Sequence, residues 1–441
     1  MEEKNFTTNK HEPTRTTTRD VLKVRDGSCG SCGSWLIFFF LFSLLFVSGL
    51  SAQIYQPQSA LLSIIETAPE ITSRAAVLID AHTGTVLYSK NPDEEIPPAS
   101  LTKLMTMHLV MKEIEEGRAS YNEIIPVTAE SWARNQPYRS SLMFLEPEQI
   151  VTLREILLGL AVVSGNDAAI AAALRLAPTV NEFAGKMTTE ARRMGLKVTR
   201  FVESSGISEN NMTTAAEFAS FCRQYLIMHP QSLIDFHSVP EFAYPMAANV
   251  REKNTSNPKT IVQENRNTLL KVFPGVDGFK TGFINESGYN IALTAQRNNT
   301  RFILVLLGAP NSRDGAFIRD KDGISLLTWA FDNFKTVRLK DIKIENAKLW
   351  KGRANTVELA LAKPADFTSP INRANNLQYT TIIEKKLTAP LPVGSHAGYF
   401  IISDEQGELN RVQLITAVNA KKGNIFKRFW HSFLLLFVKE I

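Results

Sequence analysis

Residues 97–106 read PPASLTKLMT, in which two prolines precede a serine and a lysine follows that serine three positions later. Because proline interrupts a preceding element, Ser100 is expected to open a new helix, which continues from 101 to 116. Residues i and i+3 lie on the same helix face. The sequence therefore predicts that Ser100 and Lys103 lie within hydrogen-bonding distance at a helix start.

Two further motifs follow along the chain, an S-x-N at residues 164–166 and a K-T-G at residues 280–282. Second copies of S-x-x-K and S-x-N occur at 256–259 and 208–210, so neither is specific alone, whereas K-T-G occurs once. The ordered set of three is far more specific than any member. It predicts a site for nucleophilic catalysis.

The first motif indicates a serine activated by a lysine. A lysine acts as a general base only when it is neutral, and the free side chain has a pKa of about 10.4. Burial, the positive end of the helix and a neighbouring cation all favour the neutral form, and Lys280 is the candidate cation. Lys103 would then accept the proton of Ser100 and make that serine nucleophilic.

The other two motifs supply groups that face the nucleophile. Ser164 can relay a proton to the departing amine, and Asn166 can orient the lysine or hold the substrate amide. The K-T-G motif is expected on an edge strand, where Gly282 leaves room for a peptide to pair alongside. The backbone N–H groups of Ser100 and Phe283 are the candidate oxyanion hole.

Each motif also has an ordinary structural explanation. A serine at a helix start is usually an N-cap, and a lysine three residues later usually faces solvent. A Ser-Gly-Asn-Asp stretch usually forms a turn and a cap, and Lys-Thr-Gly usually ends a strand. The occurrence of all three motifs in order favours the catalytic interpretation.

The chain is predicted to have five parts: a targeting segment at 1–52, a linker at 53–70, a catalytic domain at 71–338, a β-rich domain at 339–420 and a terminal helix at 421–441. Short β-branched runs broken by Pro and Gly indicate the β-rich domain. These runs cover 337–344, 356–361 and 411–418.

Strand-like and helix-like patterns alternate within the catalytic domain. Residues 75–80 and 85–88 flank a turn and predict a hairpin. Residues 302–308 predict a buried strand, and residues 151–162 predict a second apolar helix.

Composition limits the possible functions. The formal charge of +5 over 441 residues is too small to indicate nucleic-acid binding. Cys29 and Cys32 form a C-x-x-C without the surroundings of a redox or metal site, and they precede the predicted cleavage point. Cys222 is then alone in the mature chain, which excludes an intramolecular disulfide. No histidine spacing indicates a metal site, so neither a metal nor another cofactor is predicted.

Both ends carry signs of export and membrane attachment. Residues 35–50 are an apolar run followed by Ser51 and Ala52, which is typical of a cleaved signal, with an uncleaved anchor as the alternative. The tail predicts an amphipathic helix in the membrane interface, with packing on the protein itself as the alternative. Its aromatic residues follow i, i+3, i+4 spacing and are Phe426, Phe429, Trp430, Phe433 and Phe437.

The motifs and their flanks resemble the low-molecular-mass penicillin-binding proteins that are D-alanyl-D-alanine carboxypeptidases. The resemblance covers roughly residues 70–441 and rests most on 76–88, 98–106 and 275–283. It implies an α+β, β-lactamase-like penicilloyl-serine transferase fold, with helices on an antiparallel sheet and a small all-β domain after it. It also implies that Arg266 binds the substrate carboxylate with Thr281 as partner.

Two stretches depart from the family pattern. Some relatives carry histidine after K-T-G, where this chain has Phe283, although the backbone N–H is unaffected. Residues 201–207, FVESSGI, differ from the family's usual asparagine-containing version.

The resemblance implies an exported, peripherally anchored enzyme on the extracytoplasmic side of the membrane. It would remove the terminal D-alanine from peptidoglycan peptide stems through an acyl-enzyme on Ser100, and β-lactams would inhibit it. A D,D-endopeptidase would use the same residues. A class A β-lactamase would need a glutamate in an E-x-x-L-N stretch between S-x-N and K-T-G, which the chain lacks. The presence of every motif residue disfavours an inactive wall-binding protein.

Overall fold

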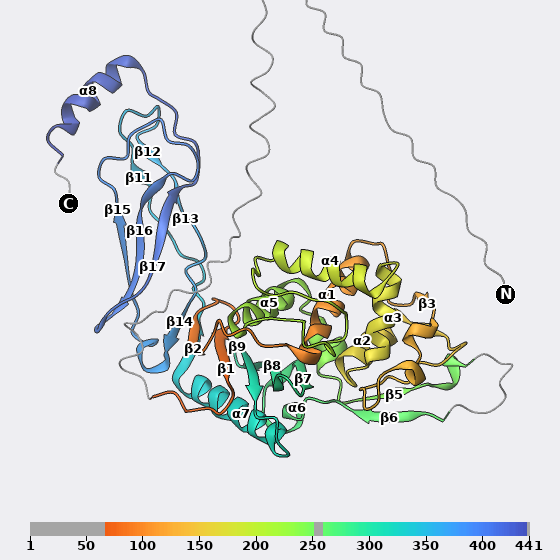
Figure 1. Ribbon diagram of the computed structural model, residues 1–441. Coiled ribbons are helices and arrows are strands. Elements are labelled where there is room, and N and C mark those ends of the chain that lie inside the picture. The colour runs from red at the N-terminus through yellow and green to blue at the C-terminus, as the bar shows by residue number, and fades with distance from the viewer. Residues whose placement is uncertain (1–66, 251–258, 439–441) are drawn as a thin grey trace, which may run out of the picture. The chain divides into compact units, whose positions relative to one another are not determined.

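The computed structural model describes residues 67–250 and 259–438 (Figure 1). The predicted targeting segment, most of the predicted linker, and the pair Cys29 and Cys32 lie outside these residues. Cys222 is buried and free.

A five-stranded antiparallel sheet forms the centre of the catalytic domain, in the order β2-β1-β9-β8-β7. The predicted hairpin and the predicted buried strand are both confirmed, the latter as part of β9. The strands are β1 (Ala75–Asp80), β2 (Val86–Lys90), β7 (Val276–Ile284), β8 (Gly288–Arg297) and β9 (Thr300–Ala309).

The central strands are apolar in succession because both faces of the sheet are covered. Alternate side chains of β1 and β9 enter two separate cores: Val77 and Val305 pack into one, and Leu78 and Leu304 into the other. On one side lie α7 (Gly315–Asn333) and the short α6 (Leu269–Val272).

The core that contains Val77 and Val305 is covered by five helices on the other side of the sheet (Figure 1). They are α1 (Lys103–Glu115), α2 (Leu153–Ala161), α3 (Asn166–Leu176), α4 (Val180–Arg193) and α5 (Ala215–Met228). The predicted helix at 151–162 is α2. Its first two positions instead form β4 (Val151–Thr152), and Thr152 caps α2 in a capping box with Glu155.

Several shorter elements connect these helices and strands. Strand β3 (Ile124–Ile125) pairs with β4, and β5 (Glu241–Tyr244) pairs with β6 (Ile261–Glu264). Short 3-10 turns lie at Ala99–Thr102, Ala129–Ser131, Ala133–Asn135, Ala247–Asn249 and Ile371–Arg373. Leu233–His237 forms a π-helical turn.

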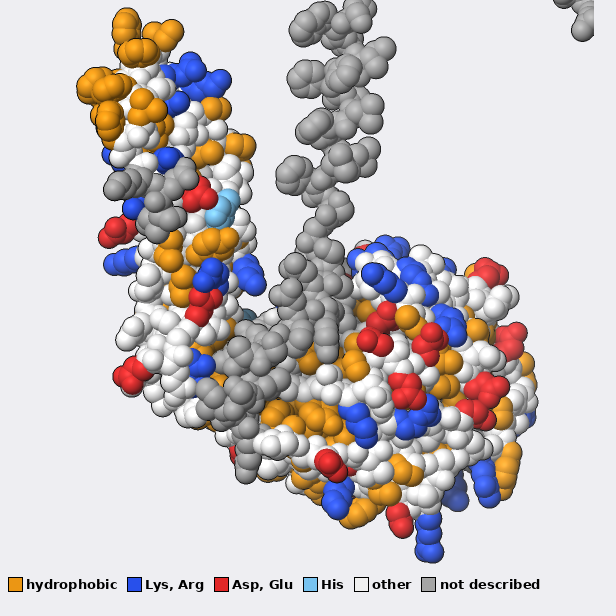
Figure 2. Space-filling view, turned by 60° about the vertical axis from the view of Figure 1, so that its left-hand side comes forward, with side chains coloured by type: hydrophobic (Ala, Val, Ile, Leu, Met, Phe, Trp, Pro, Cys, Tyr) orange, Lys and Arg blue, Asp and Glu red, His pale blue; other side chains and the backbone are white. Residues whose placement is uncertain are grey.

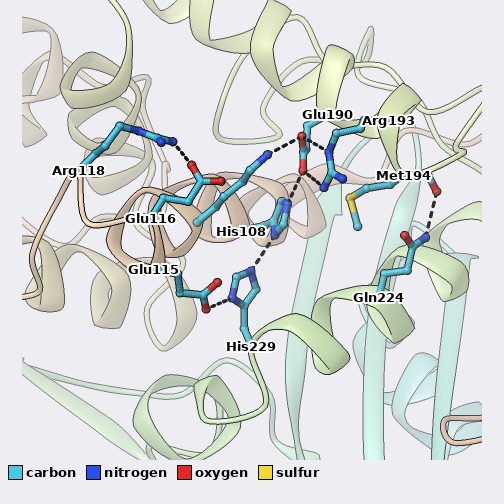
Figure 3. Close-up of polar contacts among 10 residues, drawn as sticks. His108, Glu115, Glu116, Arg118, Glu190, Arg193, Met194, Gln224 and His229 are labelled. Carbon is cyan, nitrogen blue, oxygen red and sulfur yellow. Dashed lines mark hydrogen bonds and ion pairs between the residues drawn. The ribbon is translucent and has the colours of Figure 1, made fainter. Parts of the chain in front are cut away.

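A buried polar network joins α1, α4 and the end of α5 (Figure 3). The His108 Nδ1 and the His229 Nε2 are 2.8 Å apart. The His108 Nε2 lies 2.9 Å from the Glu190 carboxylate, and the His229 Nδ1 lies 2.6 Å from the Glu115 carboxylate. Burial raises the pKa of Glu190, but hydrogen bonds from Arg193, His108 and Lys112 outweigh it and lower that pKa overall. The network therefore fixes the middle of α1, the helix that carries the predicted nucleophile at its start.

The β-rich domain contains a four-stranded antiparallel sheet in the order β13-β17-β16-β15. Its strands are β13 (Leu359–Leu361), β15 (Gln378–Ile383), β16 (His396–Asp404) and β17 (Gly407–Thr416). Strand β11 (Ala347–Lys348) pairs with β12 (Thr356–Val357), and β10 (Phe334–Val337) pairs with β14 (Phe367–Pro370). Two of the three predicted β runs thus contain strands.

The predicted strand at 337–344 is wrong beyond its first residue, because β10 ends at Val337 and residues 338–344 form no strand. The backbone N–H of Leu339 donates to the carboxylate of Asp366 at 2.9 Å instead of to a neighbouring strand. Asp341 has a φ of 56°, which breaks an extended conformation.

The tail forms helix α8 (Ile425–Leu435), capped by the side chain of Asn424. Its polar side contacts the β-rich domain: Lys427 donates to the carbonyls of Arg353 and Ala354, and His431 accepts the N–H of Lys351.

The apolar side of α8 stays exposed, and hydrophobic side chains gather around this helix (Figure 2). The exposed residues are Ile425, Phe426, Phe429, Trp430, Phe433, Leu436 and Phe437. None of the helices in the described part of the chain combines the length and apolar character needed to cross a membrane.

Candidate active site

The predicted nucleophile lies in a tight turn immediately before α1. Residues Ala99–Thr102 form a 3-10 turn and α1 begins at Lys103, so Ser100 precedes the α-helix. No side chain caps this turn. The N-cap explanation for Ser100 therefore does not hold, and its Oγ instead accepts a hydrogen bond from the Lys103 Nζ at 3.0 Å.

The amine of Lys103 is fully buried among oxygen atoms from separate parts of the chain. Its Nζ donates to the Asn166 Oδ1 at 2.7 Å and to the carbonyl of Ser205 at 2.5 Å. Burial lowers the pKa of Lys103 to about 7, although the carboxylates of Glu203 and Asp167 act in the opposite direction. A substantial fraction of the amine is therefore neutral at pH 7, which is the form a general base requires.

Lys280 is also buried, and its Nζ donates to the carbonyl of Thr281 at 3.1 Å. Burial, followed by the positive charges of Lys103, Arg266 and Arg319, holds the pKa of Lys280 well below its ordinary value. Burial is the largest cause of the lowered pKa at both lysines, and the positive charge of Lys103 further lowers the pKa of Lys280.

The S-x-N motif is a strained turn that opens α3. Ser164 has a φ of 63°, an unusual conformation for a residue with a side chain and one often found at functional sites. The buried Asp167 accepts backbone N–H groups from Met143, Phe144 and Leu145 at 2.8–3.0 Å. These bonds hold the turn against residues 143–145, a role that motif matching did not find.

The K-T-G motif lies on β7, which forms one edge of the sheet as predicted. A Cβ added to Gly282 would stand 2.9 Å from both the carbonyl oxygen of Pro98 and the amide nitrogen of Ser100. The backbone of the 3-10 turn that contains Ser100 therefore packs directly against Gly282. The sequence alone explained Gly282 by the room that a substrate peptide needs. The structure instead explains it by the close approach of the Pro98 and Ser100 backbone.

A cavity of about 1290 Å³ opens onto Ser100. Lys103 and Lys280 are buried below it, and the other predicted site residues line it, namely Ser164, Asn166, Arg266, Thr281, Gly282 and Phe283.

Two of these lining residues make contacts that the motifs did not indicate. The guanidinium of Arg266 donates to the Gln263 side chain at 3.2 Å, and the ring of Phe283 lies 4.4 Å from that of Tyr289. The predicted partner of Arg266, Thr281, lines the same cavity.

A loop that the motifs did not identify closes the site. Gly206 has a φ of 85°, and a Cβ there would lie 1.9 Å from the carbonyl oxygen of Ala99. The backbone of this loop therefore packs directly against the 3-10 turn that contains Ser100. The carbonyl of Ser205 in this loop accepts a hydrogen bond from Lys103. Every residue has a backbone carbonyl, so the sequence alone could not identify this acceptor.

Comparisons with known proteins agree with this geometry. A sequence model of the family described as D-alanyl-D-alanine carboxypeptidase matches residues 63–311, and one for the C-terminal domain of penicillin-binding protein 5 matches 331–422. The D-alanyl-D-alanine carboxypeptidase DacC of Escherichia coli is 32% identical over 376 residues, 84% of this chain and 90% of that protein. The chain belongs to the D-alanyl-D-alanine carboxypeptidase family.

Solved structures show the same fold. Penicillin-binding protein 5 from Haemophilus influenzae matches with a TM-score of 0.72 and 29% identity, over 81% of this chain and 100% of that chain. Penicillin-binding protein D2 from Listeria monocytogenes, in its cefotaxime-bound form, matches with a TM-score of 0.51 and 26% identity over 60% and 100% of the two chains. The predicted penicilloyl-serine transferase fold is confirmed, and the chain is a serine-type D-Ala-D-Ala carboxypeptidase.

The close approach of the Ser100 backbone to Gly282 predicts that a methyl group added at this position impairs the site. Gly282→Ala should slow acylation of this carboxypeptidase by a fluorescent penicillin at least about tenfold, because the new Cβ displaces the backbone of Ser100. Gly185→Ala is the matched control, since nothing lies within 4 Å of its added Cβ in α4 and alanine favours a helix. Acylation of a folded Gly282→Ala protein at the wild-type rate would contradict this account of the motif.

Proposed function

We propose that Ser100 is the nucleophile and Lys103 its general base in the removal of the terminal D-alanine from peptidoglycan peptide stems. The observation that carries this assignment is the 3.0 Å contact between the Ser100 Oγ and the Lys103 Nζ, in which the amine is fully buried. Activation of a hydroxyl by a neighbouring base follows the general logic of covalent catalysis.

The proposed reaction has two halves. The Ser100 Oγ attacks the carbonyl carbon between the two terminal D-alanines, and its proton passes to Lys103. Backbone N–H groups of Ser100 and Phe283 stabilise the negative oxygen of the tetrahedral intermediate. The hydroxyl of Ser164 gives a proton to the leaving nitrogen as the C–N bond breaks, and it takes in return the proton that Lys103 received from Ser100. Water then attacks the ester on Ser100, which releases the shortened peptide and restores the hydroxyl.

The remaining lining residues are proposed to hold the substrate. Arg266 and Thr281 bind the terminal carboxylate, because a guanidinium and a hydroxyl on one cavity wall suit a carboxylate. Asn166, whose Oδ1 already accepts from the base, orients that amine and meets the substrate amide with its NH₂ group. Lys280 and Gly282 shape the strand beside the scissile bond.

β-lactams are proposed to acylate the same serine. The cefotaxime-bound relative and the penicillin-binding name of the Haemophilus influenzae relative support this. The chemistry is the same attack on a carbonyl, and the ester that forms is hydrolysed slowly.

Loss of the hydroxyl tests the nucleophile. Ser100→Ala should abolish both D-alanine release from a pentapeptide and covalent labelling by a fluorescent penicillin, because no oxygen remains to form the ester. Ser120→Ala, at an exposed position outside the cavity lining, is the control and should leave both unchanged. Labelling that persists in Ser100→Ala would place the nucleophile elsewhere.

We further propose that the protein is exported and that α8 lies in the membrane interface. The polar side of α8 is occupied by its bonds to residues 351–354, while its aromatic side is exposed. This division supports a lipid contact over packing on the protein itself. Aromatic rings near an acyl boundary, with cations near the headgroups, are typical of interfacial helices.

The exposed rings provide a direct test of this attachment. Phe429→Ser combined with Phe433→Ser should weaken binding of the residue 53–441 protein to anionic vesicles at least about tenfold, through lost apolar burial. Tyr379→Ser with Ile382→Ser, which changes exposed apolar residues on β15, is the control. Unchanged binding of the double Phe variant would exclude α8 as the anchor.

A further inference from the structure

A single carboxylate organises the loop that supplies the third partner of the general base. The Glu203 Oε2 accepts the N–H and the hydroxyl of Ser205, both at 2.6 Å. Its Oε1 accepts the N–H of Gly206 at 2.7 Å and the Asn211 Nδ2 at 2.6 Å. Four donors at 2.6–2.7 Å therefore converge on one partly buried side chain, and three of them belong to Ser205 and Gly206.

We propose that Glu203 is a positioning residue for catalysis, which holds the carbonyl of Ser205 against the amine of Lys103 and acts on that amine as a nearby negative charge. This role rests on the proposed function of Lys103 as the general base. Glu203 itself does not line the cavity, so it acts through the loop and not on the substrate.

The loop reaches both members of the S-x-x-K motif. The carbonyl of Ser205 lies 2.5 Å from the Lys103 Nζ, one residue from the close contact between Gly206 and Ala99. The Asn211 Nδ2, bonded to Glu203, also donates to the Thr102 Oγ1 at 3.2 Å. A shift of the Glu203 carboxylate would therefore move the acceptor of the base and the backbone beside the nucleophile together.

The charge of Glu203 adds a second effect. Three charged groups face Lys103 from the elements packed around it: Glu203 from the loop, Asp167 from α3 and Lys280 from β7. Burial lowers the pKa of Lys103 to about 7, and Glu203 is the first of the two carboxylates that oppose this lowering. The same side chain thus orients the base and favours its protonated form, which limits activity at low pH.

The variant Glu203→Gln tests the effect of the Glu203 charge on Lys103 separately from its effect on the position of the loop. The second-order rate of acylation by a chromogenic β-lactam should rise with pH in the wild-type protein as Lys103 loses its proton. In Glu203→Gln the midpoint of this rise should move to lower pH by about 0.5–1 unit, because a negative charge has gone. The plateau rate should fall about tenfold, because an NH₂ group replaces one of the acceptor oxygens.

Two further variants separate these effects from general damage to the loop. Ser205→Ala removes one donor to Glu203 but keeps the charge and the carbonyl, so its midpoint should stay at the wild-type value. Glu203→Asp keeps the charge but withdraws the carboxylate by one methylene. Its plateau rate should fall while its midpoint stays unmoved. Thermal melting of each variant confirms that a folded protein is measured.

Each result bears on the proposal. If the acylation rate of the wild-type protein does not rise with pH, Lys103 is not the general base, and the proposed function on which this inference rests fails. If the wild-type rate rises with pH but the midpoint of this rise is the same in folded Glu203→Gln, the effect of the Glu203 charge on Lys103 is overturned and the proposed function is not affected. If Glu203→Gln does not fold, a Glu203→Asp protein with the wild-type plateau would overturn the positioning role.

Discussion

Burial of the Lys103 amine is the constraint on which the rest of the site depends. An ammonium group loses its hydration when it is buried, so the fold must either neutralise it or surround it with acceptors. This protein does both in part: the pKa falls to about 7, and oxygens of Ser100, Asn166 and Ser205 surround the Nζ. These three acceptors belong to the turn before α1, the start of α3 and the 203–207 loop, so this environment of Lys103 forms only when all three segments meet.

Two close backbone contacts bring these parts together. Gly206 brings the loop to Ala99, and Gly282 brings the edge strand β7 to Ser100. Neither position has space for a side chain, so the nucleophile's turn is fixed between main-chain segments on both sides. Away from the cavity, the paired imidazoles of His108 and His229 hold α1 against α4 and α5. The site is thus supported by rigid elements, which suits a reaction that depends on the position of one hydroxyl.

The sequence predicted the residues proposed for the chemistry better than the contacts that hold those residues in place. S-x-x-K, S-x-N and K-T-G pointed to Ser100, Ser164 and Lys280, because the roles proposed for them are carried by side chains. Apolar runs located β1 and β9. The start of α1 and the end of β10 were predicted less accurately. The 3-10 turn before Lys103 and the hydrogen bond that the Leu339 N–H donates to the Asp366 carboxylate both depend on tertiary contacts. The carbonyl of Ser205 was missed because every residue has one. Asp167 and Glu203 were missed because they accept backbone N–H groups, those of residues 143–145 and of 205–206, which residue identity does not reveal.

The central claim is that burial lowers the pKa of Lys103 to about 7, so that a substantial fraction of the amine is neutral near physiological pH. A titration of this side chain tests it most directly. With ¹³C label at the lysine Cε, the NMR signal that disappears in Lys103→Arg is assigned to Lys103. The account predicts that this signal titrates with a pKa of about 7. Titration at about 10.4, the value of a free lysine, would contradict it.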